Sequence, residues 1–356
     1  MQSIYLDHAA TTPLLPAARD AMDQGFALWA NPSSPHGAGR AARAALEDAR
    51  ERVKAALNWD GEVVFTSGAS EAAVLALGQV EASAQPRERF VSAVEHDALL
   101  AAAPGAPRIA VLPDGAVDEE ALVAVLAKAK QPVVAIQSIN SETGNWQNHG
   151  DLTDRIHEAG GLVVVDCSQS AGKYPLPHEI DMAILSAHKF GGPVGVGALL
   201  VREWAMLAPG GGQERGYRRG TENLPGVLGM AAALEACEEP YVSHEAYAAM
   251  MQFAGQVRAA GGTWLGDSLD APTAYIHAVA MPSLSASAQL MRFDLARIAV
   301  SQGSACSSGS MKRSPVLAAM GVDGDLADRT IRVSLGWTTT VAEIERFAEV
   351  WLGMVA

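Results

Sequence analysis

Cysteine is scarce in this sequence, with three residues in 356: Cys167, Cys237 and Cys306. They are far apart and form no CxxC pair, so the sequence predicts neither a disulfide framework nor a cysteine-bound metal site. Long hydrophobic runs are also missing, which argues against a membrane-spanning helix. The N-terminal stretch MQSIYLDHAATTP has no basic region followed by an apolar one, so a signal peptide is not expected. We therefore predict a cytoplasmic protein with no membrane partner.

Positive charge is in short supply as well. The chain has 26 lysine and arginine residues against 40 aspartate and glutamate residues, a net charge of −14. Nucleic acids attract basic surfaces, so direct nucleic-acid binding is not expected. Nucleotide-binding loops are also missing from the sequence. There is no Walker A stretch, and the glycine-rich GGPVGVG (191–197) leads into an apolar run instead of opening a helix.

What the sequence does contain is an alternation of short apolar runs and helix-like segments. Such runs are typical of parallel strands that are covered by helices on both faces. We predict seven strands in this region, at 62–65, 89–94, 108–112, 133–139, 162–166, 181–186 and 197–201. Beyond about residue 245 the predicted strands are fewer, at 274–281 and 330–335, which indicates a smaller α+β domain. Helices are expected at 39–58, 118–129, 151–160, 245–262 and 338–355. Thr340 and Glu343 form a capping box in the last of these.

Polar residues that could carry chemistry stand at the ends of two neighbouring strands, where ligands bind in open α/β sheets. Asp166 ends the strand at 162–166 and is followed by Gln169, and Lys189 follows the next strand, after Ser186 and His188. A pyridoxal phosphate (PLP) enzyme needs such a pair, a lysine for the aldehyde and a carboxylate for the pyridinium nitrogen. The alternatives are a helix cap or a structural ion pair for Asp166, and an ordinary surface lysine for Lys189.

Three other positions have both a functional and a structural interpretation. Ser70 lies where a strand passes through a glycine-containing loop into a helix, which suits either a bound phosphate or a plain helix cap. His96 directly follows a strand and could stack on a flat cofactor and move protons, although a lone histidine is more often structural. Cys306 lies in SQGSACSSGSM (301–311), where no large side chain is available to pack a free cysteine.

The order of these segments resembles that of the cysteine desulfurases of the NifS/IscS type, which are PLP-dependent fold-type I enzymes of aminotransferase class V. The stretches that carry the resemblance run from residue 5 to residue 336: YLDHAATTP, NPSSPHGAGRAAR, FTSGASE, VEHDALL, INSETG, VDCSQSAGKYP, SAHKFGGPVGVGALLVR, GGGQERGYRRGTEN, GSACSSGS and IRVSLG. An α/β fold-type I PLP-dependent transferase is thereby implied, with a mostly parallel seven-stranded sheet in its large domain. We assign residues 13–246 to the large PLP-binding domain. Residues 1–12 and 247–356 form the small α+β domain, which carries the cysteine loop.

The resemblance also implies which residues would bind the cofactor. Lys189 would hold PLP covalently, Asp166 would partner its pyridinium nitrogen, and His96 would stack over the ring with an acid–base role. Gln169 and Ser141 match positions near the phenolic oxygen. The phosphate would be bound by Ala69, Ser70, Ser186, His188 and, from the neighbouring subunit of a homodimer with shared sites, Thr221.

The reaction implied by the resemblance converts L-cysteine to L-alanine. Arg332 and Asn140 would bind the substrate, with the arginine clamping its carboxylate. Cys306 matches the nucleophilic cysteine that takes the substrate's sulfur as a persulfide, and its glycine- and serine-rich surroundings suit a thiol that must collect and then deliver sulfur. The implied partner is a sulfur-acceptor protein, an iron–sulfur scaffold or another carrier, and no metal is implied.

Three features depart from the family's pattern. Ser141 replaces the second of two asparagines, which bears on the contact with the cofactor. Trp337 stands where an arginine is often found and is expected to alter the pocket entrance. The sequence also ends soon after the last predicted helix, without the longer tail that docks the iron–sulfur scaffold in housekeeping members.

Other activities are compatible with part of this pattern. Lys189 and Asp166 would serve a selenocysteine lyase or a cysteine sulfinate desulfinase equally well, whereas Cys306 favours a desulfurase. A class V aminotransferase and a non-catalytic sulfur-relay scaffold are further alternatives. Cys167 and Cys237 are expected to pack in the interior, because strand alternation turns Cys167 to the face opposite Asp166.

Overall fold

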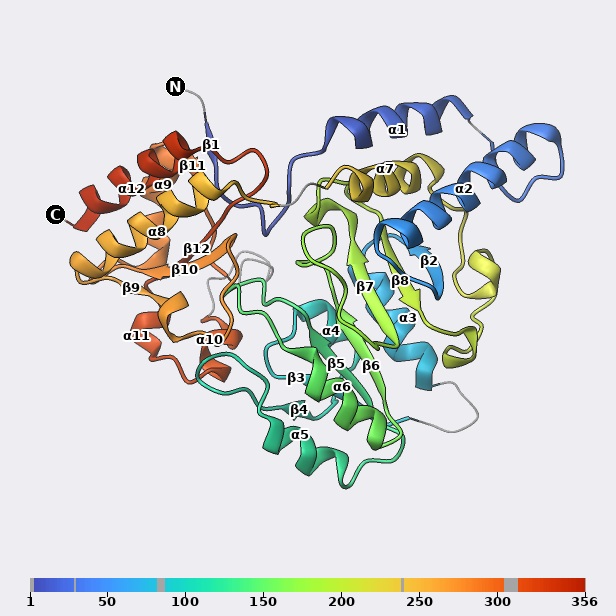
Figure 1. Ribbon diagram of the computed structural model, residues 1–356, viewed down its shortest axis with the longest axis horizontal. Helices are drawn as coiled ribbons and strands as arrows, with labels where there is room; N and C mark the ends of the chain where they lie inside the picture. Colours follow the sequence, from blue (N-terminus) through green and yellow to red (C-terminus); the bar gives the residue numbers. More distant parts are fainter. Residues whose placement is uncertain (1–2, 29, 82–86, 238–239, 304–312, 356) are drawn as a thin grey trace.

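The computed structural model describes residues 3–28, 30–81, 87–237, 240–303 and 313–355. Figure 1 shows a larger body built on one sheet and a smaller body that gathers the two ends of the chain. No helix in these residues is both long and apolar enough to span a membrane.

The larger body is centred on a seven-stranded sheet, as predicted, with the strand order β2-β8-β7-β6-β5-β3-β4. The neighbouring strands from β7 to β4 are parallel, whereas β8 is antiparallel to both β2 and β7. The bounds are β2 (Glu62–Thr66), β3 (Arg89–Ser92), β4 (Arg108–Ile109), β5 (Val133–Gln137), β6 (Leu162–Asp166), β7 (Met182–Ser186) and β8 (Gly197–Val201). Every residue of β5 to β8 is buried, which explains why these strands are almost continuous apolar runs.

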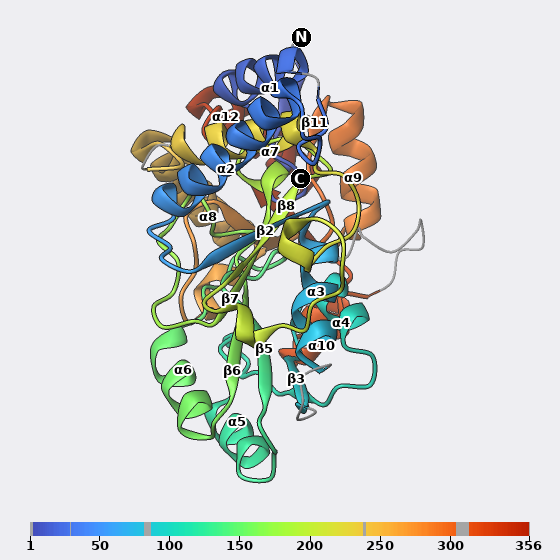
Figure 2. The ribbon, with the colours of Figure 1, turned by 90° about the vertical axis from the view of Figure 1, so that its right-hand side faces the viewer.

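Helices cover both faces of this sheet, and Figure 2 shows α6 and α3 on opposite sides of the strands. One hydrophobic cluster joins the sheet to α2 (Gly37–Ala56), α5 (Glu119–Leu126), α6 (His149–Glu158) and α7 (Leu224–Glu235). A second cluster, on the other face, includes α3 (Ala69–Glu81) and α4 (Asp97–Ala102). α1 (Pro16–Leu28) packs against α7. The sheet is therefore the middle of three layers, and its strand ends are left open for a site.

The smaller body contains a three-stranded antiparallel sheet in the order β12-β10-β9. Its strands are β9 (Thr263–Trp264), β10 (Ile276–Ala280) and β12 (Thr330–Ser334), and its longer helices are α8 (His244–Ala259), α9 (Ala286–Leu295) and α12 (Val341–Val355). Phe253, Phe293, Phe347 and Trp351 are the aromatic centre of its core. The predicted capping box lies at the start of α12, since Thr340 N donates to the Glu343 carboxylate at 2.9 Å and Glu343 N donates to Thr340 Oγ1 at 3.3 Å.

The N-terminal residues lie with the smaller body. β1 (Ile4–Tyr5) pairs in parallel with β11 (Ile298–Ala299), and Leu6 and Ala9 belong to the same hydrophobic cluster as α8 and α12. Tyr241 and Val242 also pack in this cluster, ahead of the start of α8 at His244. The domain boundary predicted between residues 246 and 247 falls within α8. We therefore propose that the small domain begins at Tyr241.

The remaining elements are short. They are the helices α10 (Pro315–Ala319) and α11 (Gly324–Ala327) and the 3₁₀ turns η1 (Ala187–Lys189), η2 (Trp204–Met206), η3 (Glu214–Gly216) and η4 (Leu265–Ser268). η1 directly follows β7, so the turn fixes the place of Lys189 at the end of that strand.

Candidate active site

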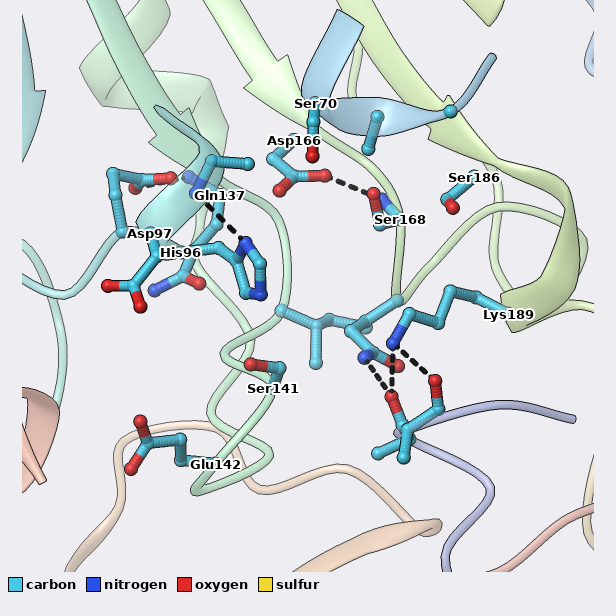
Figure 3. Close-up of a pocket in the computed structure, with 18 of the residues that line it drawn as sticks. Ser70, His96, Asp97, Gln137, Ser141, Glu142, Asp166, Ser168, Ser186 and Lys189 are labelled. Atoms are coloured by element: carbon cyan, nitrogen blue, oxygen red, sulfur yellow. Dashed lines mark hydrogen bonds between the residues drawn. The ribbon is translucent and has the colours of Figure 1, made fainter. Parts of the chain in front are cut away.

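A cavity of about 830 Å³ opens beyond the carboxyl ends of β5, β6 and β7 and is lined by residues of both bodies (Figure 3). Most of the predicted site residues line it: Ala69, Ser70, His96, Ser141, Asp166, Gln169, Ser186, His188, Lys189 and Arg332. Asn140 and Thr221 do not line it. Cys306 lies outside the described residues. Gly303, the last described residue before it, lines the cavity. The residues predicted at the ends of β6 and β7 thus line one cavity.

Lys189 reaches into this cavity from η1. Its Nζ donates hydrogen bonds to the backbone oxygens of Ala9 and Ala10, at 2.7 and 2.8 Å. Ala9 O also accepts from Gln169 Nε2 at 2.9 Å, which leaves Gln169 Oε1 buried and without a hydrogen-bond partner. The N-terminal segment therefore holds both side chains at one wall of the cavity.

Asp166 ends β6 and is only 7% exposed. Its Oδ1 accepts a hydrogen bond from Ser168 N at 2.9 Å. A second buried carboxyl group, Glu95, accepts from Gln137 N at 2.7 Å, and burial together with the charge of Asp166 raises its pKa well above the usual range. Burial and the neighbouring carboxyl group thus both favour the neutral form of Glu95.

His96 caps a helix and also lines the cavity. Its Nδ1 accepts a hydrogen bond from Ala98 N at 3.2 Å and caps α4, and its ring also lines the cavity. Because Nδ1 is an acceptor, the neutral ring carries its proton on Nε2. The cap therefore fixes both the orientation and the tautomer of the imidazole.

The start of α3 forms another wall of the cavity. Ser67, Gly68, Ala69 and Ser70 line it there, and Gly68 has a φ of +146° that suits glycine. Backbone N–H groups at a helix start attract anions. His188 lies on the same cavity, with Nδ1 3.1 Å from Thr11 Oγ1. Burial and the positive charges of Lys189 and Lys173 lower the pKa of His188 to about 4.

Arg332 enters the cavity from the centre of β12 and is 5% exposed. Its guanidinium donates to Asp7 Oδ1 and to Ser141 O, both at 2.8 Å, while its Nε is buried without a hydrogen-bond partner. Asp7 and Ser141, which are far apart in sequence, therefore orient the guanidinium. Its Nε–H group remains available to donate to an anion.

Asn140, which the resemblance assigns to the substrate, does not line the cavity. Its Oδ1 accepts from the backbone N–H groups of Glu142 and Thr143, both at 2.9 Å, and its Nδ2 donates to Val94 O at 3.2 Å. Since both ends of the amide are used within the protein and the side chain does not line the cavity, Asn140 shapes the turn that carries Ser141 and Glu142. A direct contact between Asn140 and the substrate stays a prediction.

The family of this chain follows from its similarity to known proteins. The model of the family described as "Aminotransferase class-V" matches residues 4–347. The chain belongs to the class V aminotransferases. A curated relative from Cereibacter sphaeroides named cysteine desulfurase is 39% identical, covering 98% of this chain and 95% of its own. A solved structure of a NifS-like protein has a TM-score of 0.88 at 29% identity and covers 99% of both chains. A third protein, SspA solved in complex with cysteine, has a TM-score of 0.78 at 28% identity and covers 95% of this chain and all of its own.

These similarities confirm the predicted resemblance to NifS-type desulfurases and the α/β fold-type I class. Two departures of this class V aminotransferase from the expected pattern can now be located. Ser141 lines the cavity and supplies a backbone oxygen to Arg332. Trp337 is 42% exposed and does not line the cavity, so the expected effect on the entrance has no support in the structure.

Some residues of the cavity were not singled out in the sequence. Asp7 and Glu142 lie within the stretches YLDHAATTP and INSETG, but nothing in their spacing assigned them a role. The Glu142 carboxyl group accepts a hydrogen bond from Ser314 Oγ at 2.5 Å, and burial raises its pKa. Cys167, as expected, is fully buried in the core of the larger body, and Cys237 is half-buried with its Sγ 3.2 Å from Ala233 O.

Proposed function

We propose that this protein is a PLP-dependent cysteine desulfurase, which converts L-cysteine to L-alanine and takes the sulfur onto its own Cys306. The observation that carries the proposal is the single cavity shared by Lys189, Asp166 and Arg332. A lysine and a carboxylate at neighbouring strand ends suit PLP, and a buried arginine suits an amino-acid carboxylate. The similarity to a relative named cysteine desulfurase and to SspA, which was solved in complex with cysteine, supports this activity.

The residues present fit PLP. Gln169 and Ser168 line the cavity and have buried side-chain oxygens without hydrogen-bond partners, and the helix start at Ser70 offers donors to a phosphate. A volume of about 830 Å³ is within the ordinary range for a cofactor and substrate. When bound, PLP would act as an electron sink that labilises bonds at the substrate's α-carbon.

Each residue then has a role toward the cofactor. Lys189 would bind it covalently, Asp166 would keep its ring nitrogen protonated, and His96 would cover the ring. Ser141 and Gln169 would bind near its phenolic oxygen, and for Gln169 to donate there its amide must leave Ala9 O. The phosphate would be bound by Ala69, Ser70, Ser186 and His188. Thr221 is exposed and outside the cavity, which agrees with a role toward the phosphate in the second subunit of a homodimer.

The substrate would be oriented by Arg332, with Asp7 and Ser141 O holding the guanidinium in place. Lys189 would take the α-proton after the substrate's amino group has replaced it on the cofactor and left its amine free, and His96 would move a proton at its Nε2. The thiolate of Cys306 would attack the substrate's sulfur, so that an S–S bond forms as the Cβ–S bond breaks. The electron pair of the broken bond and a proton end as a C–H bond of alanine, and both sulfur atoms are oxidised to the persulfide level. No external oxidant or reductant is needed.

The persulfide must then pass its outer sulfur to an acceptor. We propose a protein acceptor, an iron–sulfur scaffold or another sulfur carrier. The placement of Gly303 on the cavity wall is compatible with a segment that follows it and reaches the substrate.

The test is to incubate purified, PLP-loaded protein with L-cysteine and to quantify alanine and protein-bound persulfide. Wild type and Cys237→Ala, a control cysteine at a half-buried position, are expected to form both. Cys306→Ala is expected to form neither, and Lys189→Ala is expected to lose the bound cofactor's absorbance as well. Alanine formation by Cys306→Ala at the wild-type rate would instead favour the lyase alternative. A released keto acid would indicate an aminotransferase.

A further inference from the structure

Glu142 lines the cavity, and the reaction outlined above gives it no role. Its backbone belongs to a tight turn, in which Glu142 N donates to Asn140 Oδ1 at 2.9 Å and Gly144 N donates to Asn140 O at 3.0 Å. A Cβ at Gly144 would overlap the backbone oxygen of Ile276, so the turn packs directly on β10. Figure 3 shows the Glu142 side chain next to Ser141 on the cavity wall. The turn therefore presents this carboxyl group from a fixed position.

The carboxyl group of Glu142 contacts both ends of the stretch that contains Cys306. On one side is Gly303, whose backbone lies so close that a Cβ there would overlap Oε2 and would lie 2.8 Å from Cδ of Glu142. On the other side, Ser314 Oγ donates a hydrogen bond to the same oxygen, Oε2, at 2.5 Å. Glu142, Gly303 and Ser314 also line one small crevice beside the cavity. A single carboxylate oxygen thus joins two positions that flank Cys306 in the sequence.

Each of these two positions is also held by its own element. Ser301 exchanges backbone hydrogen bonds with Arg332 of β12, at 3.1 and 2.6 Å, which fixes the chain just before Gly303. Ser314 is only 6% exposed, and its Oγ caps the start of α10. Ser314 does not line the cavity, whereas Glu142 and Gly303 do. The contact at Glu142 therefore connects β12, the start of α10 and the cavity wall.

We propose that Glu142 is a positioning residue for sulfur transfer: by holding Gly303 and Ser314 together, it keeps Cys306 within reach of the substrate. Cys306 is three residues beyond Gly303, and consecutive Cα atoms are about 3.8 Å apart, so its Cα lies within about 11 Å of the Cα of Gly303. Tying the ends of a chain segment reduces its conformational freedom and raises the effective concentration of a reacting group within it. This inference rests on the proposed function, because it concerns the transfer of the substrate's sulfur to Cys306.

The test separates substrate binding from sulfur transfer in a single turnover of the PLP-loaded protein. The change in cofactor absorbance on mixing with L-cysteine measures binding, and rapid quenching measures the persulfide on Cys306. Ser314→Ala removes the donor to Glu142 and leaves the cavity lining intact. We expect persulfide formation in this variant to slow about tenfold, with binding at the wild-type rate.

Two serine variants control for the other effects of this change. Ser314→Thr keeps the hydroxyl group and the helix cap, so it should form persulfide at the wild-type rate. Ser243→Ala removes the serine cap of α8 in the same way as Ser314→Ala removes that of α10, but it breaks no contact with Glu142. It should leave both binding and persulfide formation unchanged.

A double-mutant cycle tests the contact from the other side. Gly303→Ala should also slow persulfide formation, because its methyl group would displace the Glu142 carboxyl group from Ser314. Glu142→Ala removes both contacts and should slow the step as well. In that background Gly303→Ala should have no further effect, since the oxygen that it would meet is gone. Glu142→Gln keeps an oxygen that can accept from Ser314, so it should retain most of the wild-type rate.

A merely structural role for this contact predicts a different pattern. In that case Ser314→Ala and Glu142→Ala would lower the melting temperature while persulfide formation kept its wild-type rate, and the inference would be overturned. Additive effects of Gly303→Ala and Glu142→Ala, or an equal loss in Ser243→Ala, would overturn it too. Gly303→Ala serves as the single variant if Ser314→Ala does not fold. A wild type that forms no persulfide would overturn the proposed function together with the inference, whereas normal persulfide formation in wild type and in every variant would overturn the inference alone.

Discussion

Arg332 shows how a single buried charge is prepared for a ligand. Burying a guanidinium costs free energy unless its donors are satisfied, and here Asp7 and Ser141 O satisfy two of them. Both contacts come from segments that are distant in sequence, so the orientation of this side chain is a property of the folded cavity. The planar fork of arginine allows it to keep these contacts while it binds a carboxylate.

Arg332→Lys is expected to weaken the use of L-cysteine. A lysine has one ammonium group and cannot contact Asp7, Ser141 O and a substrate carboxylate in the same geometry. Loss of one charge-assisted hydrogen bond costs about 1.5–3 kcal/mol, so kcat/KM should fall roughly 10- to 100-fold, mainly through KM. Steady-state alanine formation measures both constants.

The control is Arg258→Lys, which changes an exposed ion pair with Asp267 and should leave both constants unaltered. L-cysteine methyl ester adds a second comparison, because it lacks the carboxylate. Wild type and Arg332→Lys should use the ester almost equally. If the ester preserves the full difference between them, Arg332 does not bind the carboxylate.

Individual roles could be predicted only partly from the sequence. The grouping of Asp166 and Lys189 followed from strand ends, because parallel strands bring their carboxyl ends to one edge. Asn140 shows what could not be predicted in this way. The resemblance assigned it to the substrate, whereas the structure shows that three donors in the same turn share its amide oxygen. The direction of such a side chain depends on local hydrogen bonds that the spacing of residues does not reveal.

Elements differ in how clearly the sequence predicts them. The seven strands of the large sheet were located correctly because buried strands between helices are apolar on both faces. Their ends were less certain: the apolar run at 133–139 continues past the end of β5 at Gln137 into a turn. α1 and α7 were not predicted at all. α7 is buried at nearly every position, so it lacks the polar face that marks an amphipathic helix.

α1 was not predicted from the sequence for a related reason, because it contacts α7 through small residues. A Cβ at Gly25 would lie 2.6 Å from the Cα of Pro225, and one at Gly229 would lie 2.6 Å from Cγ of Met22. Helices that approach each other over glycine pack closely without a long apolar stripe, so hydrophobic periodicity does not reveal them.

Two glycine-to-alanine changes should therefore act in opposite directions. Alanine favours a helix interior over glycine by about 1 kcal/mol. Gly255 in α8 is exposed, and no atom lies within 4 Å of the place that an alanine methyl group would take, so Gly255→Ala should raise the free energy of unfolding by up to that amount. Gly25→Ala meets the backbone of Pro225 and should instead lower it by about 1–3 kcal/mol. Urea unfolding of both variants measures the difference, and equal effects would show that α1 and α7 do not pack this closely.

At the scale of the whole molecule, the N-terminal segment connects the two domains at the cavity. β1 pairs with β11 of the smaller body, and a few residues later Ala9 and Ala10 accept hydrogen bonds from Lys189 of the larger one. Ser301 exchanges backbone hydrogen bonds with Arg332, which places the start of the cysteine-bearing segment beside the same cavity. Residues from the two ends and the middle of the chain thus build one site, which local sequence patterns alone could not show.

The stability of the whole molecule is expected to fall in mild acid because several histidines are buried in neutral form. Burial lowers the pKa of His8, His149 and His277 from 6.5 to about 4. Below about pH 6.5 the unfolded chain binds protons at these sites and the folded chain does not, so the free energy of unfolding decreases as the pH falls toward 4. Each histidine contributes about 1 kcal/mol of this loss by pH 5.5. Glu95 acts in the opposite direction, because its raised pKa makes the folded chain bind a proton at this site more readily than the unfolded chain does.

His277→Phe isolates one of these contributions. His277 lies in β10 with its ring centroid 5.0 Å from that of Trp264, and a phenyl ring can keep this contact without titrating. The variant loses the hydrogen bond to Ala274 O at every pH, so the informative quantity is the change of unfolding free energy between pH 7.5 and pH 5.5. This change should be smaller than in wild type by about 1 kcal/mol. His178→Phe, at an exposed position, should leave it as in wild type. An unaltered pH dependence in His277→Phe would mean that His277 is protonated in the folded protein, despite its burial.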